Sequence, residues 1–286
     1  MKDQAVRPRP FTELTSTLVV IAVFTVLLSA VPFHAALAAT PPSLGSAASF
    51  AVLAGSAVTC TDSVVAGDVG VALGGAVTQT NCTIFGAVHL GDAVSQQAYA
   101  DFLAGYTAVA AVPCDVDLTG LSLAGQSLAP AVYCFNAADT ETGGTLTLVG
   151  SPTDTWIFKI GTGGTGAFTG TNFTVVMPGG VACNNNVFWW TAQAATLTDS
   201  VFIGTTLAGA DFTATRSSLD GHTLAGGTGT TSAPTGAVTL TGPGTSVCGL
   251  APPPPPPDCD KDHDDHDKDH HDKDHDKDHD KDDRKG

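Results

Sequence analysis

The chain has 286 residues, of which 43% are hydrophobic and only 14% are charged, and its formal net charge at pH 7 is −16. Between residues 39 and 251 the only basic residues are Lys159 and Arg216, against 12 acidic ones, which gives this part a net charge of −10. Such a surface cannot displace phosphate counterions, which excludes nucleic-acid binding and disfavours contact with anionic membranes.

The N-terminal segment, residues 1–38, has the pattern of a secretory signal peptide. Lys2, Arg7 and Arg9 precede a mostly apolar run, Leu18–Val31, and a small-x-small motif ends at Ala38. The run is shorter than the roughly 20 residues of a membrane span, so cleavage after Ala38 is favoured over an uncleaved anchor. The mature protein is expected to be secreted or held at the cell surface, with no membrane span.

Residues 39–251 are expected to form one domain of short strands with a single long helix. Apolar residues and threonines alternate over short stretches before Gly, Asp or Asn intervenes, as in TWIFKIG and FTVVMPGG. The segment Asp92–Val112 instead has apolar residues at helical spacing, and Pro113 stops it. A helix of about 30 Å matches roughly six strand layers about 4.8 Å apart. This match predicts one helix lying along a stack of β-coils.

Five Thr-x-Thr pairs mark the coils of this stack, and the spacing from one pair to the next is irregular. The middle residue of each pair is apolar or small. Because strand side chains alternate between faces, the middle residues are expected to point inward and the threonines outward. Irregular coils of this size bury a core only by stacking. The pairs are Thr145 and Thr147, Thr169 and Thr171, Thr196 and Thr198, Thr213 and Thr215, and Thr239 and Thr241.

Six of the seven cysteines lie between residues 39 and 251, and their even number in an exported chain favours disulfides. Six cysteines allow 15 pairings, and no C-x-x-C motif suggests a metal site. Pairing of neighbours gives the predicted bonds Cys60–Cys82, Cys114–Cys134 and Cys183–Cys248, with Cys259 left over.

The end of the chain has a different composition. Six prolines, Pro252–Pro257, predict a stiff linker. Residues 258–286 contain no apolar residue except Cys259 and are expected to be disordered. Histidines alternating with aspartates suit weak binding of zinc, nickel or copper; the alternative is a solvated spacer. These histidines are His263, His266, His270, His271, His275 and His279.

Six segments carry a more specific pattern: PSLGSAASFAVLAGSAV at 42–58, VVAGDVGV at 64–71, LAPAVYCFNAA at 128–138, GTLTLVG at 144–150, WIFKIG at 156–161 and ACNNNVFWW at 182–190. With the helix after GAVHLGDAV and the strand GAVTL at 236–240, they resemble the microbial ice-binding proteins, whose domain is called ice-binding-like. The resemblance covers about residues 43–247. The departures are extra asparagines in CNNNVFWW and the insertion GGTGTTSAPT at 226–235, both in turns.

The resemblance implies an irregular, right-handed β-solenoid of triangular section, in which N-terminal strands complete coils begun elsewhere. It also implies that the helix packs along one face and that a flat outer face binds ice. Threonine suits such a face because its β-branch restricts χ1 and because it offers a methyl and a hydroxyl together. The ten paired threonines are therefore the candidate ice-binding residues, and the protein is expected to act as a monomer on the ice surface.

No enzyme activity is expected. Between the signal and the tail the only histidines are His89 and His222, and there is no G-x-S-x-G motif. The glycines of Gly161–Gly166 fit G-x-G-x-x-G, but a strand follows them, whereas a dinucleotide site needs a helix N-terminus. No catalytic residue and no required cofactor are therefore predicted. Two other functions stay open: an adhesion module of the cell surface or matrix, and an extracytoplasmic metal-binding protein acting through its tail.

Overall fold

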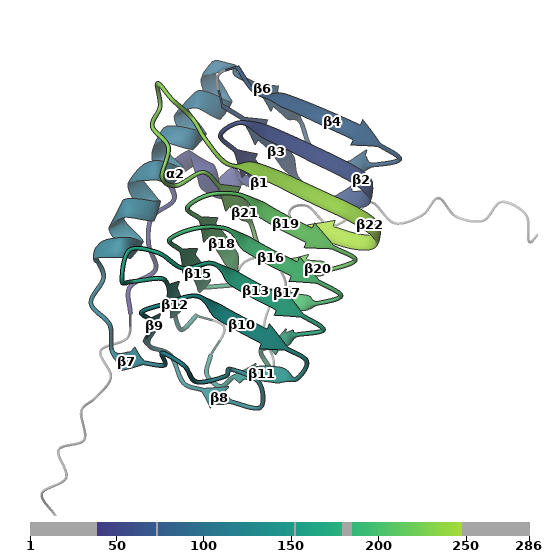
Figure 1. The fold of residues 1–286 in the computed structure, drawn as a ribbon. Helices are drawn as coiled ribbons and strands as arrows, with labels where there is room; N and C mark the ends of the chain where they lie inside the picture. The colour runs from purple at the N-terminus through teal and green to yellow at the C-terminus, as the bar shows by residue number, and fades with distance from the viewer. Residues whose placement is uncertain (1–38, 73, 152, 179–184, 248–286) are drawn as a thin grey trace, which may run out of the picture. The chain divides into compact units, whose positions relative to one another are not determined.

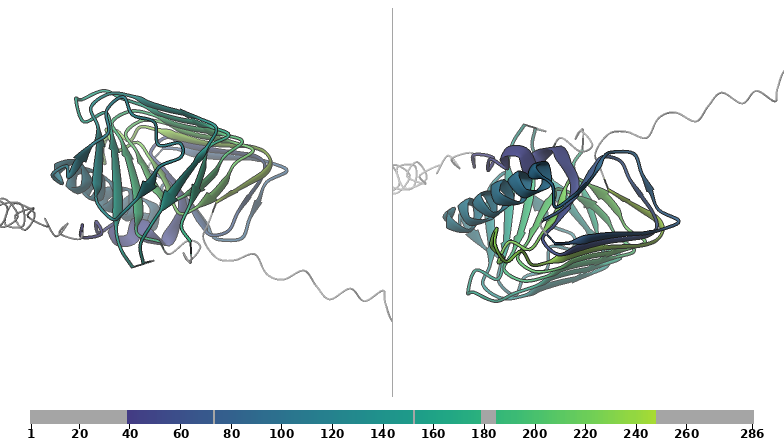
Figure 2. Two further views of the ribbon diagram at one scale, coloured as in Figure 1. Left: turned by 90° about the horizontal axis from the view of Figure 1, so that it is seen from below. Right: turned by 90° about the horizontal axis from the view of Figure 1, so that it is seen from above.

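The computed structural model describes residues 39–72, 74–151, 153–178 and 185–247. These residues form a stack of β-coils with one long helix along its side (Figure 1). Every strand pair among them is parallel. This is expected because successive coils run in the same direction, so each strand lies beside the equivalent strand of the next coil. Viewed along the stack, the coils enclose a three-sided section (Figure 2). The predicted β-solenoid with a helix packed alongside is confirmed.

The sheet that lies against the helix, which we call the helix face, has nine strands. Its two end strands, β6 and β7, each have only one neighbour in the sheet. In spatial order the strands are β6 (Val88–Leu90), β3 (Asp68–Val71), β1 (Phe50–Ala54), β21 (Thr223–Ala225), β18 (Thr205–Ala208), β15 (Val187–Thr191), β12 (Trp156–Ile160), β9 (Val132–Phe135) and β7 (Val116–Asp117).

The other two faces belong to one sheet, because the long strands β2 (Ala57–Val65) and β22 (Ala237–Val247) run across the corner between them. The first of these, the threonine face, also contains β4 (Ala76–Thr80), β19 (Phe212–Thr215), β16 (Ala195–Thr198), β13 (Phe168–Thr171) and β10 (Asp139–Thr142). The second, the third face, also contains β5 (Thr83–Ile84), β20 (Ser218–Asp220), β17 (Val201–Ile203), β14 (Thr174–Val176), β11 (Thr145–Leu148) and β8 (Ser127–Leu128).

The two ends of the solenoid domain meet inside the stack. Strand β1 pairs with β21, and β2 pairs with β22 over both halves of its length. The N-terminal coils therefore stack on the last coil of the domain, and β22 lies between β19 and β2. This arrangement confirms that N-terminal strands complete coils begun elsewhere in the sequence.

The interior is filled by inward-pointing side chains of the three faces, with aromatic rings stacked from layer to layer. Phe158 lies parallel to Trp189, with ring centroids 4.0 Å apart, and Tyr133 stacks on its other side at 5.3 Å. These three residues occupy one register position of β9, β12 and β15. Each buried aromatic side chain contributes about 2–3 kcal/mol through removal of apolar surface from water.

Helix α2 (Ala93–Ala111) is the long helix that the sequence predicts over 92–112. Asp92 caps it by accepting a hydrogen bond from the Ser95 amide at 2.8 Å, and this bond lowers the pKa of Asp92 to about 2. Tyr99, Phe102 and Tyr106 are buried against the helix face and against the short helix η1 (Gly45–Ser49). Trp189 and Trp190 are consecutive residues of β15. Trp189 lies in the core, and Trp190 packs under this helix.

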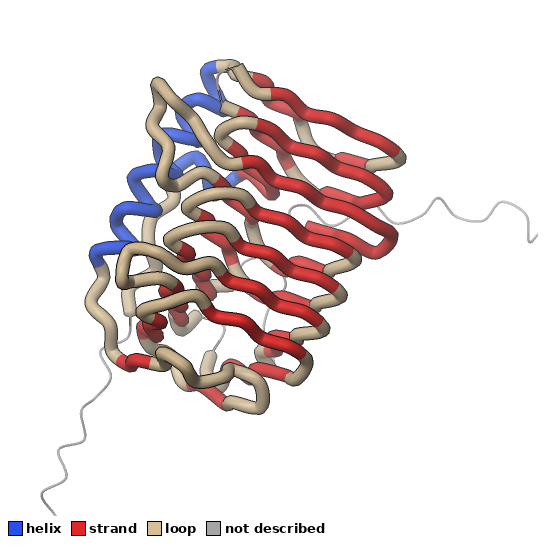
Figure 3. Tube along the Cα trace, in the orientation of Figure 1, coloured by secondary structure: helices blue, strands red, loops and turns tan. Residues whose placement is uncertain are grey.

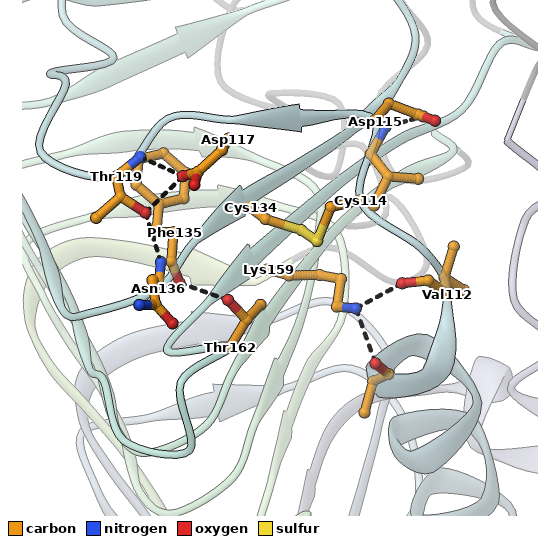
Figure 4. Close-up of a disulfide and its surroundings, with 12 residues drawn as sticks. Val112, Cys114, Asp115, Asp117, Thr119, Cys134, Phe135, Asn136, Lys159 and Thr162 are labelled. Carbon is orange, nitrogen blue, oxygen red and sulfur yellow. Dashed lines mark hydrogen bonds between the residues drawn. A yellow bond between two sulfur atoms is a disulfide. The ribbon is translucent and has the colours of Figure 1, made fainter.

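A buried lysine holds the other end of the helix, as Figure 4 shows. The Nζ of Lys159 donates hydrogen bonds to the carbonyls of Ala110 and Val112 at 2.8 and 2.6 Å. These carbonyls belong to the last turn, where helix carbonyls have no intrahelical partner and the helix dipole favours a cation. Burial lowers the pKa of Lys159.

Two of the three predicted disulfides are confirmed, Cys60–Cys82 and Cys114–Cys134. The first ties β2 to the turn between β4 and β5, and the second ties the segment after α2 to β9. Cys183, Cys248 and Cys259 lie outside the described residues, as do the predicted signal peptide, the proline linker and the histidine tail.

Candidate functional site

The threonine face carries the same residue pattern on seven consecutive strands, in the order β10, β13, β16, β19, β22, β2 and β4. At each strand two threonines, two residues apart, occupy equivalent register positions. Figure 3 shows these strands running side by side down one side of the stack. The pairs are Thr140 and Thr142, Thr169 and Thr171, Thr196 and Thr198, Thr213 and Thr215, Thr239 and Thr241, Thr59 and Thr61, and Thr78 and Thr80.

The outward direction of these threonines follows from burial. On β16 and β19 the residues alternate between buried and half-buried, with Leu197 and Ala214 fully buried between half-exposed threonines. Neighbouring strands lie about 4.8 Å apart, and residues i and i+2 about 7 Å apart. The outcome is a flat two-column array of methyl and hydroxyl groups. None of its outward positions carries a charge.

Four of the five predicted pairs belong to this array, and the pair Thr145 and Thr147 does not. These two threonines lie on β11, which pairs with β14 and β8 in the third face. The equivalent position on the threonine face is taken by Thr140 and Thr142, one strand earlier in the chain. Grouping Thr145 and Thr147 with the other pairs was therefore wrong, because the chain turns a corner at Gly143 between the two motifs.

The residue after each outward pair marks the corner where the chain leaves the threonine face. Asp62, Asn81, Asn172, Asp199 and Arg216 all have φ between 48° and 51°, and glycine stands at the other two corners. Non-glycine residues rarely adopt this left-handed conformation, and Asn and Asp tolerate it best. Thr-x-Thr followed by such a residue is thus a more complete signal than Thr-x-Thr alone. It selects Thr59, Thr78 and Thr140, which sequence reasoning missed.

Buried serines stabilise the same corner from the inside. Ser63, Ser200 and Ser217 each donate a hydrogen bond to the carbonyl of the second threonine of their coil, at 2.7, 2.9 and 3.0 Å. On the outside, Arg216 forms a two-point ion pair with Asp199 of the coil before it, both contacts at 2.7 Å. The ion pair is exposed and adds little stability. The serine bonds fix the backbone that presents the threonines.

Two carboxylates replace apolar residues on the inner side of β10, the end strand of the array. Both carboxylate oxygens of Glu141 have hydrogen-bond donors. The carboxylate accepts from the Ser122 hydroxyl and the Leu123 amide, both at 2.6 Å, and from the Ala124 amide at 3.3 Å. Asp139 is 8% exposed, and its Oδ2 has no hydrogen-bond partner. Burial, together with the nearby charge of Glu141, raises the pKa of Asp139 to about 7.

The two histidines contribute to packing. His89 shares a 2.7 Å hydrogen bond with Asp92 and lies edge-on to Phe50. The Nδ1 of His222 lies 2.7 Å from the Phe50 carbonyl, and burial lowers its pKa. Within the described part of the chain, no group of three or more His, Cys, Asp or Glu side chains converges as a metal site would require.

The threonine face is thus an extended two-column array of outward threonines in which no outward position carries a charge. The chain belongs to the ice-binding-like family, whose model matches residues 52–244. This membership confirms the predicted family and the prediction that the protein is not an enzyme. No helix among the described residues is long and apolar enough to cross a membrane.

Relatives of known identity agree with this assignment. The chain is 36% identical over 193 residues to an ice-binding protein of Nostoc sp. (strain HG1), covering 65% of this chain and 70% of the relative. It superimposes with a TM-score of 0.62 on an ice-binding protein of the Antarctic ascomycete Antarctomyces psychrotrophicus, at 29% identity, covering 74% of this chain and 100% of the other. A protein from an Antarctic biological consortium gives the same TM-score at 28% identity, with 73% and 91% covered.

Proposed function

We propose that the protein binds ice through its threonine face. The observation that carries the proposal is the unbroken register of Thr-x-Thr pairs over seven strands. Proteins that it resembles in sequence and in fold are named as ice-binding proteins, which supports the same reading.

Ice binding requires side chains that are held in a regular array, and it does not require a reactive group. A threonine on a strand has few accessible χ1 states, so its methyl and hydroxyl keep fixed positions. Two perpendicular repeats, of about 4.8 and about 7 Å, then impose a two-dimensional lattice on the water that covers the face. An array without lysine or arginine leaves this water undisturbed by mobile, strongly hydrated cations. Ordered water of this kind is able to join a growing crystal.

The direct test is the shape of an ice crystal grown slowly in a micromolar solution of the protein. Adsorption to particular planes is expected to give a faceted crystal and a gap between melting and freezing temperatures. Growth of unmodified discs would reject ice binding. It would favour the alternative, an adhesion module that uses the same face against another solid or a polymer.

Export is part of the proposal. The two disulfides of the described residues are typical of proteins that fold in an oxidising compartment. Together with the signal-like segment 1–38, they support a secreted or surface-held protein. N-terminal sequencing of the exported protein is expected to begin at Ala39, and a chain that begins at Met1 would contradict cleavage.

We further propose that the tail binds divalent metal weakly and independently of ice. Removal of residues 258–286 is expected to abolish the heat of zinc or nickel binding measured by calorimetry. It is expected to leave the shaping of ice crystals unchanged. For the whole chain, the heat of metal binding is expected to be smaller at pH 5.5 than at pH 7.5, because imidazole must be neutral to act as a ligand. Heat that survives truncation would place the metal site elsewhere, and no heat in either form would make the tail a solvated spacer.

A further inference from the structure

Two of the buried serines at the corner also join one coil to the next. The Oγ of Ser200 donates to the carbonyl of Thr198 in its own coil at 2.9 Å, and accepts from the amide of Phe173 in the coil before at 3.2 Å. In the following coil, the Oγ of Ser217 donates to the carbonyl of Thr215 at 3.0 Å and accepts from the amide of Ser200 at 3.1 Å. Ser200 and Ser217 thus link three consecutive coils by a chain of hydrogen bonds, which we call the serine ladder.

The ladder supplies acceptors to amides that the corner turns away from the neighbouring strand. At the corner, the residue with positive φ donates its own N–H to the second threonine of the next coil, as Asn172 does to Thr198 at 2.9 Å. The residue that follows it, Phe173 in one coil and Ser200 in the next, donates its N–H to a serine hydroxyl. Because a buried amide without an acceptor is costly, a hydroxyl at this position stabilises the corner.

The same hydroxyls hold the carbonyl of the second threonine from a second direction. The Thr215 carbonyl accepts from the Asp199 amide of the coil before at 2.9 Å, and from the Ser217 hydroxyl of its own coil at 3.0 Å. The Thr198 carbonyl has the same two kinds of donor, both at 2.9 Å. A carbonyl oxygen has two lone pairs, and both are used here. The peptide plane after each of these threonines is therefore fixed, and with it the direction of the threonine side chain.

We infer that Ser200 and Ser217 are positioning residues of the ice-contact surface, which hold the second threonine column in register over β13, β16 and β19. Ser200 is 2% exposed and Ser217 is 0% exposed, so neither side chain reaches ice itself. A recognition surface requires its side chains to be held to within about 0.5 Å by the residues behind them. The inference rests on the proposed function, because it assigns the ladder to binding of ice by the threonine face.

The test is Ser200→Ala, which removes the donor to Thr198 and the acceptor of the Phe173 amide without adding bulk. Thermal hysteresis at matched concentration is expected to fall at least about twofold, because the second threonine column loses its fixed positions. Circular dichroism checks that the variant is folded at the temperature of the measurement. Ser217→Ala provides a second variant if Ser200→Ala fails to fold, and the same loss is expected from it.

Ser95→Ala is the matched control. Ser95 is also fully buried, and its Oγ also donates to a backbone carbonyl, that of Asp92 at 3.2 Å. It lies in the first turn of α2, away from the threonine face. Hysteresis of this variant is expected to equal that of the wild type. An equal loss of hysteresis in Ser95→Ala and Ser200→Ala would reduce the effect to general destabilisation and would overturn the inference.

Nuclear magnetic resonance tests the ladder without ice. The methyl order parameter of Thr198 is expected to fall in Ser200→Ala and to stay at the wild-type value in Ser95→Ala, and the Phe173 amide is expected to exchange faster in Ser200→Ala only. An unchanged Thr198 methyl group in a folded Ser200→Ala variant rejects the positioning role. Absence of hysteresis in the wild-type protein instead rejects ice binding, so the two failures are read from different measurements.

Discussion

A Thr213→Tyr variant is expected to lose most of its thermal hysteresis while keeping the wild-type melting temperature. Thr213 lies on β19, the central strand of the seven, with its side chain outward and half-exposed. A tyrosine ring there would stand above the plane of the array and hold the surrounding threonines away from the crystal. The core below, formed by Phe212 and Ala214, is not touched. The measurement is thermal hysteresis at matched concentration, with circular dichroism for the melting temperature.

Thr145→Tyr is the matched control. It makes the same substitution at an exposed threonine of a Thr-x-Thr pair, but on β11 in the third face. Its hysteresis is expected to equal that of the wild type. Full hysteresis in Thr213→Tyr together with a loss in Thr145→Tyr would move the ice-binding surface to the third face.

The second large effect is expected from Asp139→Asn, which should stabilise the protein at pH 8. The pKa of Asp139 is about 7 in the folded protein, against 3.8 for the ordinary carboxyl. Between these two values the unfolded chain has released a proton that the folded protein still holds, so the free energy of unfolding falls as pH rises from about 4 to about 7. Above pH 7 the folded protein carries a buried charge next to Glu141. Asparagine removes that charge, and the gain is on the order of 2–3 kcal/mol after discounting for solvent screening.

Urea unfolding at pH 5 and pH 8 tests this prediction. The stability difference between Asp139→Asn and the wild type is expected to be larger at pH 8 than at pH 5. Glu141→Gln should have the opposite sign, because its carboxylate accepts from three donors and an amide NH₂ would oppose one of them. A variant Asp139→Asn that is less stable than wild type at pH 8 would mean that the charged carboxylate has a partner in the folded protein.

The sequence predicts the architecture well because the signals for it are local. The helix has a capping aspartate, a stopping proline and apolar residues at helical spacing, and its observed bounds, Ala93–Ala111, fall just inside the predicted ones. Strand alternation and the short spacing between Thr196 and Thr213 likewise reflect one turn of one coil.

The site was predicted only in part, because membership of the array depends on contacts between distant segments. Glu141 between two threonines is not an expected inward residue, and its burial is made tolerable by hydrogen bonds from the Ser122 hydroxyl and from the amides of Leu123 and Ala124. Thr59 and Thr78 join the array because β2 pairs with β22, a strand from the opposite end of the domain's sequence.

The position of β22 has a consequence for how the protein folds. The N-terminal coils have their stacking partner in β21 and β22, so they cannot complete their core until nearly the whole domain has been synthesised. Closing a loop of this length before its contacts are gained slows folding, as in other proteins dominated by contacts between distant residues. During that interval β1 and β2 expose apolar strands that pair readily with other chains. The order of the strands therefore predicts slow folding and a nascent chain that needs protection from aggregation.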